Sequence, residues 1–154
     1  MVKTLISHTL PQFIQDHREQ VVTAALDSLR RRGETASLLS ARSEELVRWL
    51  DAIVAGVETW PAVATSEEQG LFQREFGILW FKHGVPLHEV VRALHVLKSK
   101  IVELARWQGG AQNALEIYIE EELEHRVSFF FDWLFYEVVL GYELAGTTPR
   151  TAIP

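Results

Sequence analysis

Apolar residues recur at steps of three and four positions along almost the whole of this 154-residue chain. Such spacing places side chains on one face of an α-helix. Strands would instead alternate apolar and polar residues, and the chain has no sustained alternation and no Asn-Gly or Asp-Gly hairpin turn. The sequence therefore predicts an all-α protein. The clearest stripe, within residues 87–107, comprises Leu87, Val90, Val91, Leu94, Leu97, Ile101, Leu104 and Ala105.

Breaks in this pattern divide the chain into five or six helices. Glycine, proline and capping residues stand at the breaks, as is usual for helix boundaries. Residues 34–42 are predicted to form a connector. Because short connections favour antiparallel neighbours, we expect an antiparallel bundle or a globin-like packing without haem, ending in a long C-terminal helix. The expected helices cover about 4–32, 43–60, 66–84, 86–107 and 112–142.

The length suits a single domain with a sizeable core. We expect this helical domain to span residues 1–143. The remaining residues, 144–154, include two prolines and several small residues, a composition typical of a flexible tail or linker.

Composition excludes several classes of function. The net charge of −6 disfavours nucleic acid as a partner, since binding phosphates needs a clustered positive field. Without cysteine, the chain cannot form a disulfide, a thiolate nucleophile or a Cys-ligated metal site. No apolar run reaches the roughly 18 to 20 residues of a membrane span, so we expect a soluble cytoplasmic protein. No phosphate loop, dinucleotide glycine pattern or nucleophile elbow occurs, which predicts a protein that is not an enzyme.

Three polar residues, His88, Arg92 and His95, follow a row beside the apolar stripe. His88 and His95 lie two helical turns apart, about 10 Å along the axis, so they cannot share one metal ion. Arg92 between them would also repel a cation. We interpret the row as a solvated flank. Two alternatives stay open: the three side chains bind an anion or polar ligand, or a single histidine, His95 or His125, ligates haem in a globin-like pocket.

Glu122 and His125 form a Glu-x-x-His pair in the last predicted helix. Di-iron helical bundles use two such pairs together with further glutamates. No other histidine has a glutamate three positions before it, so half of that ligand set is missing. A carboxylate–histidine metal site is therefore a weaker alternative to a charged, solvated face.

The last predicted helix is apolar on every side over residues 129–136. Such a helix must be covered all round, and consecutive residues point about 100° apart, so a small domain is not expected to bury the whole run. Exposed aromatic surfaces are typical of interfaces, and we expect a homodimer. The alternatives are that the domain itself, or an apolar ligand, covers the helix. The residues assigned to the dimer interface are Phe129, Phe130, Trp133, Leu134, Tyr136 and Glu137.

The stretch of residues 77–105 contains the turn Gly84-Val85-Pro86-Leu87 followed by an amphipathic helix, and it resembles a bacterial family of signalling proteins. It is similar to the helical N-terminal input domain of RsbRD-type co-antagonists of the stressosome, a type of domain that also precedes sensor histidine kinases. The resemblance implies a globin-like fold without haem, no catalytic residues, and a downstream or partner module of the kinase or STAS-like kind. No such module is recognisable in this sequence. The matching residues are Gly84, Val85, Pro86, Leu87, Val90, Val91, Leu94, Leu97 and Lys98.

Together, these patterns and the resemblance predict a sensory or regulatory input domain without enzymatic activity or a cofactor. It would dimerise through its last helix and relay a signal along that helix. A globin-like sensor that binds haem or another small ligand, and a carboxylate–histidine metal bundle, are the alternatives.

Overall fold

The computed structural model describes the backbone of residues 2–41, 43–59, 66–109 and 114–147, and the side chains of 16–41, 43–57, 67–104, 106, 121 and 124–147. Within these ranges the chain forms six helices and no strand, which confirms the predicted all-α class. The helices are α1 (Val2–Arg32), α2 (Ala36–Ala41), α3 (Ser43–Thr59), α4 (Ser66–Lys82), α5 (Leu87–Gly109) and α6 (Ala114–Thr147).

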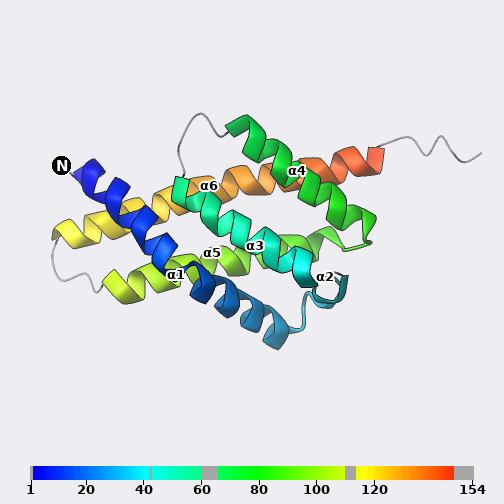
Figure 1. Ribbon diagram of the computed structural model, residues 1–154, viewed down its shortest axis with the longest axis horizontal. Helices are drawn as coiled ribbons and strands as arrows, with labels where there is room; N and C mark the ends of the chain where they lie inside the picture. The colour runs from blue at the N-terminus through cyan, green and yellow to red at the C-terminus, as the bar shows by residue number, and fades with distance from the viewer. Residues whose placement is uncertain (1, 42, 60–65, 110–113, 148–154) are drawn as a thin grey trace, which may run out of the picture.

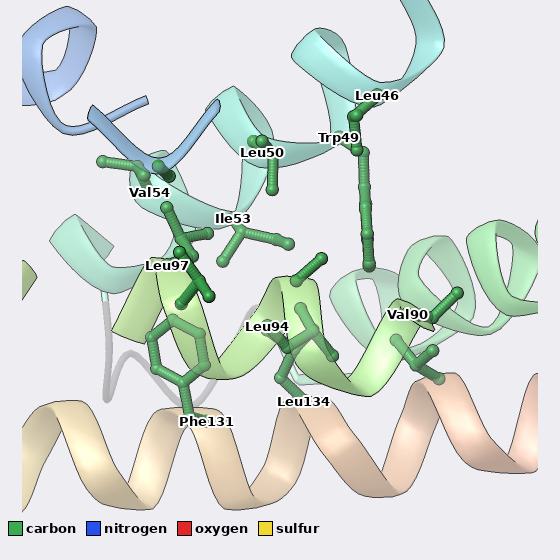
Figure 2. Close-up of a cluster of buried hydrophobic side chains, with 14 of the residues drawn as sticks. Leu46, Trp49, Leu50, Ile53, Val54, Val90, Leu94, Leu97, Phe131 and Leu134 are labelled. Carbon is green, nitrogen blue, oxygen red and sulfur yellow. The ribbon is translucent and has the colours of Figure 1, made fainter. Parts of the chain in front are cut away.

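The helices surround one apolar core, with α5 and α6 running alongside each other in opposite directions (Figure 1). Figure 2 shows how the layers meet: Leu50 and Ile53 of α3 approach α5 from one side, and Phe131 and Leu134 of α6 approach it from the other. All four of these side chains are buried. The first helix packs against α3 and α5, and α4 packs along α6. Apolar faces at helical spacing thus find partners on neighbouring helices, as the sequence pattern requires.

The segment predicted to be a connector contains the short helix α2. Its amino end is held by Glu89 of α5, whose carboxylate oxygen Oε1 accepts hydrogen bonds from the backbone N–H groups of Ser37 (2.9 Å) and Leu38 (3.2 Å). A negative charge that accepts free N–H groups stabilises the start of a helix. The prediction of a connector was wrong because the stabilising group comes from a distant part of the chain, which local sequence signals do not reveal.

A tight turn at residues 83–86 joins α4 to α5. Gly84 has a φ of +73°, in the left-handed region that glycine adopts without strain, and the amide of Val85 donates to the carbonyl of Trp80 at 3.0 Å. Tyr142 of α6 donates its hydroxyl proton to the carbonyl of Val85 at 2.7 Å. Burial, and to a lesser extent the charge of Glu89, raise the pKa of Tyr142. The turn predicted from Gly84 and Pro86 is therefore present and is tied to the C-terminal half of α6.

The last helix continues to Thr147, four residues beyond the expected end of the domain at 143. At its end, the Thr147 hydroxyl donates to the carbonyl oxygens of Glu143 (2.9 Å) or Leu144 (3.2 Å). Residues 144–147 therefore belong to the helix and not to a tail. Residues 148–154 lie outside the described part of the chain.

Candidate functional site

A seam of small residues joins α4 to α6. A Cβ atom added to Gly77 would lie 3.2 Å from the Cα of Gly141 and would clash with the carbonyl oxygen of Val138. A Cβ atom added to Gly141 would clash with the carbonyl oxygen of Arg74. The two backbones therefore touch directly, which only glycine permits at these positions.

A partly buried ion pair lies beside this seam. Arg74 of α4 contacts Glu137 of α6 through two nitrogens: Nε donates to Oε2, and Nη2 lies 3.4 Å from Oε1. The hydrogen bond to Glu137 raises the pKa of Arg74, and desolvation opposes it. The Glu137 side chain is almost fully buried, and a Cβ atom at Gly70 would lie 3.3 Å from its carboxylate. Glycine at position 70 thus leaves room for the carboxylate, and the two-point contact fixes α4 on α6.

The outward side of α6 carries an apolar row of five residues, which we call the α6 row. Phe129 is 66% exposed, Tyr136 62% and Leu144 47%, and the half-buried Trp133 and Leu140 lie between them. The first four positions follow steps of four, three and four, so they lie on one side of the helix. This spacing is that of the apolar seam of a coiled coil.

A second, shorter row lies on the outward side of α4. It consists of Leu71, which is 54% exposed, and the half-buried Ile78, and we call it the α4 row. These residues directly follow Gly70 and Gly77, the two glycines of α4 that face α6. Each therefore points about 100° round the helix from the seam.

The sequence assigned six residues to a dimer interface, and the structure divides them. Phe129 and Tyr136 are exposed and Trp133 is half-buried. The other three, Phe130, Leu134 and Glu137, are buried within the chain's own fold, so they are not available to a partner. The sequence could not separate these three from the exposed residues, because an aromatic run on every side of a helix does not reveal which side meets the core.

The three polar residues on α5 do not converge on one point. His88, Arg92 and His95 are all exposed, in agreement with a solvated flank. Arg92 pairs with Glu34, with 3.0 Å between Nε and Oε2, whereas the His95 ring lies 4.7 Å from the ring of Phe135 on α6. The pKa of His95 is lowered, chiefly by desolvation and then by the charges of Lys98 and Arg92.

His95 lines an open groove of about 760 Å³ between α5 and α6. Its walls carry both signs of charge, and one ion pair joins Arg106 of α5 to Glu124 of α6. The rest of the lining includes Lys98, Ser99, Val102, Glu103 and Ser128. Such a groove is suited to a small polar ligand rather than to an apolar one.

The described part of the chain has no set of side chains suited to bind haem or a metal ion. A haem ligand would have to face an enclosed apolar pocket, but His95 and His125 are both exposed. No group of three or more His, Cys, Asp or Glu among the described residues is arranged to hold a metal ion. His125 belongs to the predicted Glu-x-x-His pair, but the side chain of Glu122 lies outside the described residues.

Among the described residues, no helix combines the length and the apolar character that crossing a bilayer requires. Comparisons with protein-family models, with curated proteins and with solved structures find no match for this chain. The resemblance to stressosome input domains therefore stays a prediction.

The seam between α4 and α6 was not predicted from the sequence. One signal was available: Gly70 and Gly77 are seven residues apart, which places them on one side of a helix. Nothing in the sequence pairs Gly77 with Gly141 or links Arg74 to Glu137, because each pair is separated by more than 60 positions.

Proposed function

We propose that this chain is a regulatory input domain without enzymatic activity, which forms a homodimer through the outward side of α6. The observation that carries this proposal is the exposure of the apolar α6 row on a helix that also packs against the core, α4 and α5. Aromatic residues are favoured at the centres of protein interfaces. A second copy of the chain would cover the row on both protomers at once.

The proposal includes a relay along α6 to a downstream or partner module of the kinase or STAS-like kind, in the cytoplasm. With 34 residues, α6 spans about 51 Å, so a change at one end can reach a partner well beyond the core. The buried acidic residues support a structural rather than a catalytic role. Glu89 accepts hydrogen bonds from the start of α2, and Glu137 is paired with Arg74.

Sedimentation equilibrium of the wild-type chain and of Tyr136→Glu tests the dimer. We expect the wild type to show twice the chain mass of 17.6 kDa at micromolar concentration, and the variant to show the mass of a monomer. Val47→Glu is the matched control, since Val47 is 42% exposed on α3, away from the α6 row. A wild-type chain that is monomeric at 100 µM would contradict the proposal.

A second candidate function, sensing of a small polar ligand, is favoured by the groove beside His95. The cationic group of Lys98, together with the His95 ring and the nearby hydroxyl of Ser99 as hydrogen-bond donors, suits an anion. Titration with inorganic phosphate, followed by the NMR signals of the His95 ring, tests this candidate. Saturable shifts that disappear in Lys98→Ala would support it, and identical shifts with chloride would oppose it.

A further inference from the structure

We propose that the second copy is bound by α4 as well as α6, through one continuous surface formed by the α4 row and the α6 row. The inference rests on the proposed homodimer and deepens it, because it adds an element that the sequence did not assign to the interface. It concerns Leu71, which is exposed, and Ile78, which is half-buried, on the outward side of α4.

The direction of the helices places both rows on the same side. Gly77 of α4 contacts Gly141 of α6. Further along both helices, Phe81, four residues after Gly77, lies against Gly146, five residues after Gly141. The two helices therefore run in the same general direction. On α4 the outward row follows the seam glycines by one residue. On α6 the row includes Tyr136 and Leu140, which precede the seam residues Glu137 and Gly141 by one.

One residue forward on α4 and one residue back on α6 turn the side-chain direction by about 100° in opposite senses. Because the two helices run in the same general direction and face each other at the seam, both rows lie on the same side of the helix pair. The opposite side of the pair is the one that meets the core. There α4 contributes the buried Phe76 and Trp80, and α6 contributes the buried Leu134 and Val138. The α4 row and the α6 row thus form a single outward surface with the seam along its middle.

The seam adds no free charge to this surface. The ion pair between Arg74 and Glu137 that lies on it is internal to the chain, and its carboxylate is buried. Charged residues lie beyond the rows instead: Glu75 and Lys82 on α4, and Asp132 and Glu143 on α6, are all exposed. An apolar centre with a charged rim is the usual anatomy of a protein interface.

The exposed apolar area of the two rows favours a second copy of the chain that covers both of them. The three exposed members of the α6 row, Phe129, Tyr136 and Leu144, offer roughly 350 Å² of side chain, taking about 150 to 250 Å² for each fully exposed aromatic residue. A stable interface buries about 800 Å² on each partner, of which roughly 60% is apolar. These three residues alone provide less than that apolar area. The α4 row, together with Phe81, which is 38% exposed beside Gly146, brings the total to roughly 500 Å².

Substitutions on α4 test the inference separately from the dimer itself. We expect Leu71→Glu to weaken dimerisation at least tenfold in sedimentation velocity, as Tyr136→Glu does, while Val47→Glu leaves the dissociation constant within twofold of wild type. Circular dichroism checks that each variant is folded. If Tyr136→Glu dissociates the dimer and Leu71→Glu does not, the interface is confined to α6 and the inference is wrong, although the proposed dimer stands. A monomeric wild type would instead overturn the proposed dimer itself.

A labelling experiment covers the case in which Leu71→Glu does not fold. This chain has no cysteine, so Leu71→Cys introduces a single thiol. We expect maleimide to label this thiol at least fivefold more slowly at a protein concentration where the dimer predominates than under dilute conditions. The control Val47→Cys should react at the same rate at both concentrations. Equal rates for Leu71→Cys at both concentrations, with a dimer present, would show that α4 lies outside the interface.

Discussion

Gly77 of α4 and Gly141 of α6 lie back to back, and a Cβ atom on either residue would clash with a backbone carbonyl of the opposite helix. Helices usually pack with 8 to 10 Å between their axes because side chains separate them. Here no side chain lies between the backbones at the crossing. This contact sets the position of α4, and hence the direction in which the outward sides of both helices point.

Replacing either glycine by alanine should destabilise the fold. Backbone atoms cannot move aside as a flexible side chain would, so we expect Gly77→Ala and Gly141→Ala each to lower the free energy of unfolding by about 1 to 3 kcal/mol. The control is Gly146→Ala, where the new Cβ would lie at an ordinary distance of 3.6 Å from the Phe81 ring. Its stability should be unchanged or slightly higher, because alanine favours a helix over glycine. Urea denaturation measures the free energy of unfolding of the three variants. If all three lost the same amount of stability, a specific backbone contact between Gly77 and Gly141 would be contradicted.

The ion pair between Arg74 and Glu137 should contribute more to stability than the exposed pair between Arg92 and Glu34. Loss of the arginine leaves the buried Glu137 carboxylate without its cation, which is unfavourable in a poorly hydrated site. We expect Arg74→Leu to lower the urea midpoint clearly and Arg92→Leu to leave it nearly unchanged. If the two variants denature at the same midpoint, Glu137 is hydrated well enough to do without its partner.

Glu89 provides a third test, at the start of α2. Its removal in Glu89→Ala leaves the backbone N–H groups of Ser37 and Leu38 without their acceptor, at a cost of about 1 to 3 kcal/mol. Glu89→Gln retains an acceptor and should lose less. The control Glu103→Ala removes an exposed carboxylate of the same helix. Hydrogen exchange should show faster exchange of the Leu38 amide in Glu89→Ala only.

The sequence predicted the helices well because helical periodicity is a local property. The breaks at Gly33, Gly84 and Pro86 lie where they were expected, and the stripe from Val90 to Ile101 faces the core. The short helix α2 was missed because a carboxylate some 50 residues away holds it. A single sequence shows that a helix has an apolar face, but it rarely shows which other element packs against that face.

The candidate site was predicted only in part, for a related reason. In α6 the apolar side chains point in every direction, so periodicity could not separate the buried Phe130 and Leu134 from the exposed Phe129 and Tyr136. That separation depends on where α4 and α5 pack. Leu71 was not predicted to belong to an interface. A single exposed leucine on a helix does not indicate an interface until the structure places it beside the α6 row.

His95 should make stability depend on pH in a narrow window. Its pKa lies below the ordinary value of 6.5, mainly through desolvation and then through Lys98 and Arg92. The unfolded chain therefore binds this proton more readily than the folded chain does. The contribution of His95 is complete above about pH 6.5 and falls as the pH drops toward the lowered pKa. We expect His95→Gln to reduce this loss, and Lys98→Ala to raise the pKa of His95 in an NMR titration. A His95 pKa at or above 6.5 would contradict the assignment.

The orientation of the two protomers follows from the proposed relay. If both copies of α6 pass a signal to one module, their C-terminal ends must lie at the same end of the dimer, so the helices run parallel about a twofold axis. Residues with the same number then lie at the same height along the whole α6 row. In an antiparallel pair centred on Tyr136, the two copies of Phe129 would be roughly 20 Å apart along the axis.

Single cysteines in the cysteine-free chain distinguish these arrangements. We expect a short bis-maleimide to cross-link Phe129→Cys, Tyr136→Cys and Leu144→Cys with similar yields at concentrations where the dimer predominates. The control Val47→Cys, on α3, should give no cross-linked product. Cross-linking of Tyr136→Cys alone would mean that the protomers are antiparallel, and the C-terminal ends of α6 would then point away from each other. A relay from both helices to one shared module would be ruled out by that result, while the dimer surface itself would remain.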